Sequence, residues 1–159
     1  MSRYPELAAK VDAFFARTVA RHGSDMQCGT GCSDCCHVRL TVTAVEARAI
    51  RDEIAAWPDE QRRALVANAA ASADRCAALD GAGRCLIYAA RPIVCRSHGG
   101  PIRLRRDSLP VIESCFRNFT HTAPDPDCIV DQETLSALVL AVNDGDATRI
   151  DLAELLATC

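Results

Sequence analysis

The segment Cys28-Gly-Thr-Gly-Cys32-Ser-Asp-Cys35-Cys36 carries four thiols within nine residues. Cysteine sulfurs two to four residues apart can turn back onto one metal ion, and the intervening glycines allow the tight backbone that this requires. The vicinal pair Cys35–Cys36 is a different case, because adjacent side chains of an extended backbone point to opposite sides. The pair therefore predicts two neighbouring metal ions or one multinuclear cluster, with each thiolate on a different metal atom.

A second group of cysteines is spread more widely along the chain, at Cys76, Cys85, Cys95 and Cys115. Their spacing lacks the C-x-x-C pattern of a zinc ribbon, so the fold must bring these side chains together. Eight thiols in two groups suit two four-cysteine sites, or one iron–sulfur cluster together with one zinc ion. Buried thiols or redox-active disulfides are the alternative interpretation.

The composition is that of an ordinary globular protein apart from its cysteines. The chain has 159 residues, ten of them cysteine, with 49% hydrophobic residues, 25% charged residues and a net charge of −3. This length predicts a single domain over residues 1–159, and the balance of apolar and charged residues excludes a mostly disordered chain. The negative charge argues against a nucleic-acid partner. A protein partner is left open.

We expect a cytoplasmic protein that does not enter a membrane. The sequence has no apolar run of the length that a membrane span needs, and residues 1–10 lack the pattern of a secretory signal. Disulfides are rare in a reducing cytoplasm, so a high cysteine content in such a protein indicates metal binding first.

The hydrophobic pattern predicts a mostly α-helical fold. Apolar side chains that recur every three to four residues predict five helices, over residues 5–22, 43–57, 58–78, 131–142 and 150–156. Thr43 and Glu46 form a capping box at the start of the second helix. Asp146 or Thr148 is expected to cap the last helix.

Between the helices, the chain is expected to form an irregular, cysteine-rich metal-binding core. Residues 84–128 are punctuated by glycine and proline and show no helical period. Within this stretch, residues 102–104 and 110–112 are expected to pair as one short β-hairpin. The predicted fold class is therefore a small helical domain around an irregular metal centre.

Two segments carry a family resemblance. Residues 28–47 and 76–99 resemble the two halves of the CxxCxxCC family of zinc- or iron-chelating domains, also called the YkgJ-type cysteine cluster family. The family pattern C-x-I-Y-x-x-R-P-x-x-C-R matches residues 85–96, and the resemblance covers about residues 26–117. One departure is that three residues, not two, separate Cys28 from Cys32.

The resemblance implies zinc or iron as the cofactor, and it implies the metal ligands Cys28, Cys32, Cys35, Cys36, Cys76, Cys85, Cys95 and Cys115. A similar cysteine motif in flagellin lysine methylases adds an iron–sulfur cluster to the options. His37 and His98 lie beside cysteines and are alternative ligands. Cys128 and Cys159 fall outside the pattern, and no role is assigned to them.

The other motif residues are expected to support the ligands. A metal ion or cluster with four thiolates is anionic, and Arg84, Arg91 and Arg96 lie beside the cysteines, where they can donate to sulfur or offset the charge. Tyr88 and Pro92 are expected to fix the chain between two ligands, with the Tyr88 ring packed and its hydroxyl satisfied.

Three functions fit these observations. The first is a metal-binding protein without catalysis, because all-cysteine sites are usually closed to substrate. The second is an iron–sulfur redox enzyme or electron carrier. The third is a thiol-based redox switch, either at Cys35–Cys36 or at the two cysteines outside the pattern, Cys128 and Cys159. The sequence contains no GxGxxG, P-loop or HExxH motif that would indicate another class of enzyme.

Overall fold

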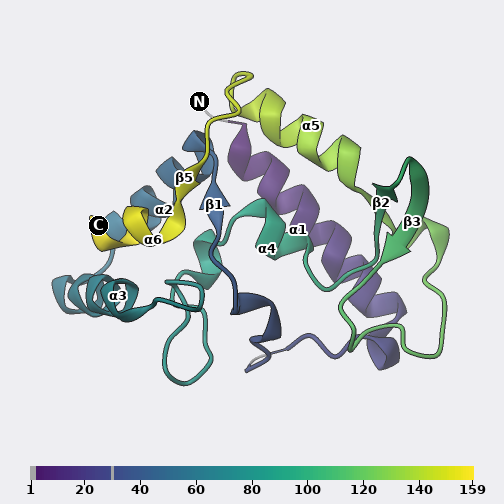
Figure 1. Cartoon of the computed structure of the whole chain (residues 1–159), viewed down its shortest axis with the longest axis horizontal. Coiled ribbons are helices and arrows are strands. Elements are labelled where there is room, and N and C mark those ends of the chain that lie inside the picture. Colours follow the sequence, from purple (N-terminus) through teal and green to yellow (C-terminus); the bar gives the residue numbers. More distant parts are fainter. Residues whose placement is uncertain (1–2, 30) are drawn as a thin grey trace. The chain divides into compact units, whose positions relative to one another are not determined.

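A computed structural model of the chain describes residues 3–29 and 31–159; Met1, Ser2 and Thr30 lie outside the described residues. The described residues form six helices and five short strands, which confirms the mostly α-helical prediction (Figure 1). They belong to two compact units. Unit 1 contains the described residues up to Gly29 together with Ile93–Gly145, and unit 2 contains those from Gly31 to Pro92 together with Asp146–Cys159. No helix in the described part of the chain is long and apolar enough to cross a membrane.

Unit 1 is organised around its first helix, α1 (Tyr4–Arg21), which contacts α4 (Ile93–Ser97) and α5 (Gln132–Val142). The buried face of α1 is apolar apart from Thr18, which is only 1% exposed. The Thr18 hydroxyl donates a 3.2 Å hydrogen bond to the carbonyl oxygen of Phe14. This bond to the preceding turn allows a polar side chain to be buried there.

The predicted hairpin is present in unit 1 and is longer than expected. Strand β2 (Ile102–Arg106) pairs antiparallel with β3 (Leu109–Glu113), and β4 (Val130–Asp131) adds to the other edge of β2 in parallel. Asp107 and Ser108 connect β2 to β3 with φ angles of +49° and +68°. Two residues with positive φ match the twist of a tight hairpin turn, which explains why pairing continues up to the turn.

Unit 2 contains the remaining elements. They are β1 (Thr41–Val42), α2 (Ala44–Ala55), α3 (Asp59–Ala71), β5 (Ile150–Asp151) and α6 (Leu152–Ala157). β1 and β5 pair antiparallel, although they are more than a hundred residues apart in sequence. This pairing brings the end of the chain back to the segment that follows the first cysteines.

The helix ends of unit 2 show one confirmed prediction and two corrections. The capping box is confirmed, since Glu46 accepts hydrogen bonds from the backbone N–H and the hydroxyl of Thr43. Helix α3 ends at Ala71 instead of residue 78. Helix α6 is capped by Asp151, and not by Asp146 or Thr148, because residues 150–151 belong to β5.

The early end of α3 has a local cause. The Ser72 hydroxyl donates a 2.7 Å hydrogen bond to the carbonyl oxygen of Asn68, one turn before it. The Asn68 side-chain amide donates to the carbonyl oxygens of Ala77 at 2.8 Å and Leu79 at 3.0 Å. The chain therefore folds back along α3 and delivers residues 76–79 to the side of the helix.

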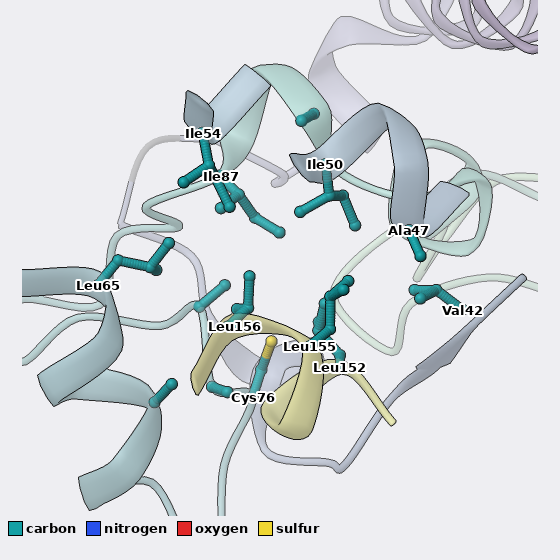
Figure 2. Close-up of a cluster of buried hydrophobic side chains, with 14 of the residues drawn as sticks. Val42, Ala47, Ile50, Ile54, Leu65, Cys76, Ile87, Leu152, Leu155 and Leu156 are labelled. Carbon is teal, nitrogen blue, oxygen red and sulfur yellow. The ribbon is translucent and has the colours of Figure 1, made fainter. Parts of the chain in front are cut away.

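The core of unit 2 is a cluster of buried apolar side chains from α2, α3, α6 and the segment 76–90, together with Val42 of β1 (Figure 2). Its largest members are at most 2% exposed; they are Ile50, Ile54, Leu65, Ile87, Leu152, Leu155 and Leu156. Cys76 belongs to the same cluster and is 6% exposed. One cysteine of the motif is thus part of the hydrophobic core.

Candidate metal centre

The structure regroups the eight candidate ligands. Cys28, Cys95 and Cys115 belong to unit 1, while the other five belong to unit 2, namely Cys32, Cys35, Cys36, Cys76 and Cys85. None of the ten cysteines forms a disulfide. The two sequence groups, residues 28–36 and 76–115, are therefore each divided between the two units.

The vicinal pair has a geometry that the sequence did not predict. Cys35 and Cys36 end a 3₁₀ turn, η2 (Asp34–Cys36), which is closed by a 2.8 Å hydrogen bond from the Cys36 N–H to the carbonyl oxygen of Ser33. In this helical backbone the two side chains do not point apart, and their Sγ atoms are 4.0 Å from each other. The expectation of two diverging thiols, which assumed extended backbone, is wrong.

Cys76 is hydrogen-bonded through its backbone to the vicinal pair. Its backbone N–H donates a 2.7 Å hydrogen bond to the carbonyl oxygen of Cys36. The neighbouring loop is also in contact, because a Cβ placed on Gly83 would lie 3.4 Å from the Ser33 hydroxyl oxygen. Gly83 has a φ of +75°, a conformation that glycine adopts without strain. The segment that contains Cys32 and the vicinal pair therefore packs against the segment of the second cysteine group.

A narrow backbone loop brings Cys85 back to Cys76. Leu79 and Cys85 form an antiparallel bridge, and the Leu86 N–H donates to the Ala78 carbonyl oxygen at 2.8 Å. These bonds fold residues 76–86 into a small hairpin. The wide Cys76-x8-Cys85 spacing, which has no short zinc-ribbon pattern, is therefore closed by strand-like pairing.

The tip of this hairpin is held by Asp80. Its carboxylate accepts hydrogen bonds from the backbone N–H groups of Ala82 at 2.9 Å and Arg84 at 2.8 Å, and from Arg84 Nε at 3.0 Å. These donors hold the pKa of Asp80 below its ordinary value, the Arg84 backbone bond contributing most. Arg84, expected to offset charge on sulfur, pairs with Asp80 at this turn.

The four thiols Cys35, Cys36, Cys76 and Cys85 influence one another electrostatically, and we call them the unit 2 thiol cluster. The hydrogen bond to Cys35 raises the pKa of Cys36 far above its ordinary value, and burial and the charges of the other three thiols act in the same direction. Burial is the main cause of the raised pKa of Cys76 and of Cys85. Without a cation, Cys36, Cys76 and Cys85 therefore favour the neutral thiol.

Backbone N–H groups oppose this effect at the two hairpin cysteines. The backbone N–H groups of Ala78 and Leu79 lower the pKa of Cys76, and that of Ile87 lowers the pKa of Cys85; each favours the thiolate. These N–H groups lie two or three residues after the cysteine, so they belong to the turn that follows each sulfur. This arrangement prepares both sulfurs to carry negative charge.

The motif arginines have different roles. The positive charge of Arg91 lowers the pKa of Cys85, as expected for an arginine that offsets the charge of a ligand. Its guanidinium lies 4.0 Å from the centroid of the Tyr88 ring, and Tyr88 is 64% exposed instead of packed. Arg96 is buried in unit 1 and forms an ion pair with Asp12 of α1.

In unit 1, the sulfur of Cys28 lies against two residues that the sequence analysis did not select as functional. Asn118 Nδ2 donates to Cys28 Sγ at 3.2 Å. A Cβ placed on Gly99 would lie 2.5 Å from the same sulfur. Asn118 lies beyond the cysteine motif and Gly99 has no side chain, so only the tertiary contacts reveal them.

The other two thiols of unit 1, Cys95 and Cys115, lie on backbone segments that lead to Gly99 and Asn118. Cys95 lies on α4, four residues before Gly99, and both Cys95 and Cys115 are partly buried. The carbonyl oxygen of Cys115 accepts a 2.8 Å hydrogen bond from the N–H of Asn118. Cys28, Cys95 and Cys115 therefore all belong to segments that meet at Asn118 and Gly99.

The two alternative ligands and the two cysteines outside the family pattern have different surroundings. His37 and His98, the alternative ligands, are exposed. Cys128 is fully buried, with its Sγ 4.0 Å from Nη1 of Arg21. The Cys159 thiol donates a 3.2 Å hydrogen bond to the Leu155 carbonyl oxygen, and burial raises its pKa.

Within residues 3–29 and 31–159, no group of three or more His, Cys, Asp or Glu side chains is placed so that it could hold a metal ion. The unit 2 thiol cluster nevertheless has the chemistry of a metal-binding donor set, with soft sulfurs, backbone N–H groups that favour two of the thiolates and a guanidinium that acts in the same direction. Thiolate ligands select zinc, copper(I) and iron–sulfur clusters over hard cations. The residues present therefore fit a zinc- or iron-binding group.

The model of the CxxCxxCC family matches residues 27–116, more than half of the chain, and its description is "Putative zinc- or iron-chelating domain". The chain belongs to the CxxCxxCC family. No curated protein and no solved structure matches it. In this CxxCxxCC protein the family segment crosses the boundary between the units at Gly29 and again at Ile93. Asn118 lies just outside the matched segment.

Proposed function

We propose that the protein holds a single zinc or iron ion in unit 2 through the thiolates of Cys35, Cys36, Cys76 and Cys85. The observation that carries this proposal is the 4.0 Å separation of Cys35 Sγ and Cys36 Sγ. Four sulfurs placed tetrahedrally at about 2.3 Å from a zinc ion lie roughly 3.8 Å from one another. In a [4Fe–4S] cluster each thiolate binds a different iron atom, which requires more widely separated sulfurs. The spacing therefore favours one ion chelated by both members of the pair.

The surroundings of the cluster support a closed, non-catalytic site. Cys76 is part of the hydrophobic core, and the hairpin that joins it to Cys85 is hydrogen-bonded to the carbonyl oxygen of Cys36 and to the side-chain amide of Asn68. A bound ion would link the segment before β1 to this hairpin and to the core. Four thiolate ligands leave no open position for a substrate, which is the arrangement of structural zinc. Binding energy of the ion then becomes folding energy.

We further propose that the other candidate ligands contribute to metal binding as the family pattern implies. Cys28, Cys95 and Cys115 lie in unit 1 on segments that meet at Asn118. Cys32 lies in unit 2, in the loop that packs against Gly83. We treat the thiols of unit 1 as a second centre, separate from the unit 2 thiol cluster.

A redox switch at Cys35–Cys36 is the second candidate function, because the two sulfurs are close and Cys35 is exposed. The adjacency of the two residues argues against it, because neighbouring Cα atoms lie about 3.8 Å apart, short of the roughly 4.4–6.8 Å that an unstrained disulfide needs. A metal ion that stabilises the thiolates would also block their oxidation. The metal-binding function is therefore the better supported of the two.

The experiment is metal and sulfide analysis of protein purified anaerobically without chelator from cells supplied with both zinc and iron. The proposal expects at least one equivalent of zinc or iron per chain and no acid-labile sulfide in the unit 2 site. Replacing Cys36 with Ser should remove one ion, whereas Cys159→Ser, the matched control, should remove none. Sulfide that disappears with Cys36→Ser would instead identify an iron–sulfur cluster, and protein without transition metal would contradict the function altogether.

A further inference from the structure

Asn118 is a buried polar residue at the centre of unit 1, only 3% exposed. Its side-chain oxygen accepts a 2.7 Å hydrogen bond from the N–H of Gln27. Its side-chain nitrogen donates to the carbonyl oxygen of Gly99 at 2.6 Å and to Cys28 Sγ at 3.2 Å. One amide group thus bonds the residue before Cys28, the sulfur of Cys28 and the turn after α4.

The backbone of Asn118 is also fixed. Its N–H donates to the carbonyl oxygen of Cys115, and the next N–H, that of Phe119, donates to the carbonyl oxygen of Asp25 at 3.0 Å. The turn that begins at Cys115 is therefore bonded to the segment that leads into Cys28. The side chain of Asn118 has little freedom to leave the sulfur.

Gly99 closes the other side of the Cys28 sulfur. It has a φ of +94°, and a Cβ at this position would lie 2.5 Å from Cys28 Sγ, closer than any real carbon–sulfur contact. The same Cβ would lie 3.5 Å from Asn118 Nδ2, which is ordinary contact. Glycine is therefore required here both by the backbone conformation and by the position of the sulfur.

We propose that Asn118 and Gly99 are positioning residues that seat the sulfur of Cys28 for metal binding, with the Asn118 amide as a hydrogen-bond donor to the bound thiolate. The inference rests on the proposed function of Cys28 as a ligand. Cys28 itself is exposed, so Asn118 and Gly99 cover one side of the sulfur and leave room for an ion on another. Hydrogen-bond donors to a ligand orient it and stabilise its charge, and their loss weakens metal binding.

The test measures the alkylation rate of each cysteine by iodoacetamide and peptide mass spectrometry, on the full chain with and without zinc. Zinc should protect Cys28 in the wild-type protein. Asn118→Ala removes the donor, and Gly99→Ala displaces the sulfur while leaving the Asn118 amide in place. Each should weaken zinc binding at Cys28 about 10–100-fold, seen as a matching rise in the zinc concentration that protects Cys28.

Two matched controls separate seating from folding. Gly145 also has a positive φ, +78°, but a Cβ there meets nothing within 4 Å, so Gly145→Ala repeats the backbone strain without touching the sulfur. Ser114→Ala removes a hydroxyl that bonds the carbonyl oxygens of Cys115 and Asn118 in the same turn. Both controls should retain wild-type protection. Cys128, fully buried in unit 1, reports by its slow alkylation that the unit is folded.

The possible outcomes are distinct. The proposal is supported if zinc protects Cys28 less well in both test variants, while Cys128 is still alkylated slowly and zinc still protects the unit 2 thiol cluster. Unchanged protection in either variant would overturn it while leaving the metal-binding function intact. If zinc does not protect Cys28 in the wild-type protein, Cys28 is not a ligand. This result would overturn both the positioning role of Asn118 and Gly99 and the proposed role of Cys28 in metal binding.

Discussion

The backbone N–H of Cys76 donates a 2.7 Å hydrogen bond to the carbonyl oxygen of Cys36, although forty residues of sequence separate them. This bond joins the vicinal pair to the hairpin that carries Cys85. It places members of the two sequence groups in one thiol cluster within unit 2. Sulfur proximity in this protein therefore follows the fold and not the spacing along the chain.

The first prediction concerns how the ligands are divided. Cys36→Ser, Cys76→Ser and the double variant should each lose the same single ion, because they disrupt one site and their effects are not additive. The metal losses caused by Cys28→Ser and Cys76→Ser should add, because we propose Cys28 as a ligand of the second centre. Metal content per chain, measured by elemental analysis, checks both statements. An additive loss for Cys36 and Cys76 would show that they serve different ions.

The second prediction concerns charge compensation by Arg91. Its guanidinium lowers the pKa of Cys85, so Arg91→Gln should weaken metal binding in unit 2 by about 10–100-fold, the usual effect of losing an outer partner of a ligand. Arg84→Gln is the matched control, because Arg84 pairs with Asp80 at the hairpin tip. Competition titrations with a chromogenic chelator measure both affinities. Equal metal affinities in the two variants would show that Arg91 does not support metal binding in unit 2.

The third prediction concerns stability. Because Cys76 lies in the core of unit 2, an ion that holds its sulfur should also hold the core packing. Free zinc at about 100 times its Kd should add about 2.7 kcal/mol to the stability of the folded state. Calorimetry should show a higher Tm with zinc and a lower one after chelation. In Cys76→Ser the zinc-dependent shift should be much smaller; a shift of wild-type size would contradict the site.

The fourth prediction concerns the N-terminus of α6. Asp151 accepts hydrogen bonds from the N–H groups of Ala153 and Glu154, and its carboxylate pairs with Arg39 at 2.9 Å. Asp151→Ala should therefore cost about 1 kcal/mol of stability through loss of the cap. Asp151→Asn keeps a capping oxygen and loses the ion pair, so it should cost less. Denaturant unfolding measures both variants.

Asp151 also gives a pH dependence of known sign. Arg39 and the capping N–H groups lower its pKa in the folded protein, so the carboxylate stabilises the folded state at pH values above its unfolded pKa of about 3.9. This contribution should be lost as the pH falls through the lower, folded pKa. Asp151→Asn should flatten that part of the pH profile of unfolding. An unchanged profile would show that Asp151 does not titrate in this way.

Local chemistry in the sequence determined the family, the helical class, the capping box at Thr43 and the hairpin of β2 and β3. These features depend on residues that are close in sequence, such as an apolar period, a cap or a short turn. Periodicity extended α3 too far, because its end depends on Asn68 binding the carbonyl oxygens of Ala77 and Leu79. The true cap of α6, Asp151, depends on the pairing of β5 with β1.

The three-dimensional structure alone, through local backbone conformation and through tertiary contacts, decided which sulfurs are neighbours. A vicinal pair in extended backbone would diverge, but the 3₁₀ turn at Asp34–Cys36 brings the two sulfurs to 4.0 Å. The division of the cysteines between the units and the seat of Cys28 on Asn118 and Gly99 come from contacts between distant segments. Spacing fixes only how far a chain can reach, whereas backbone hydrogen bonds and core packing fix where each thiol is held.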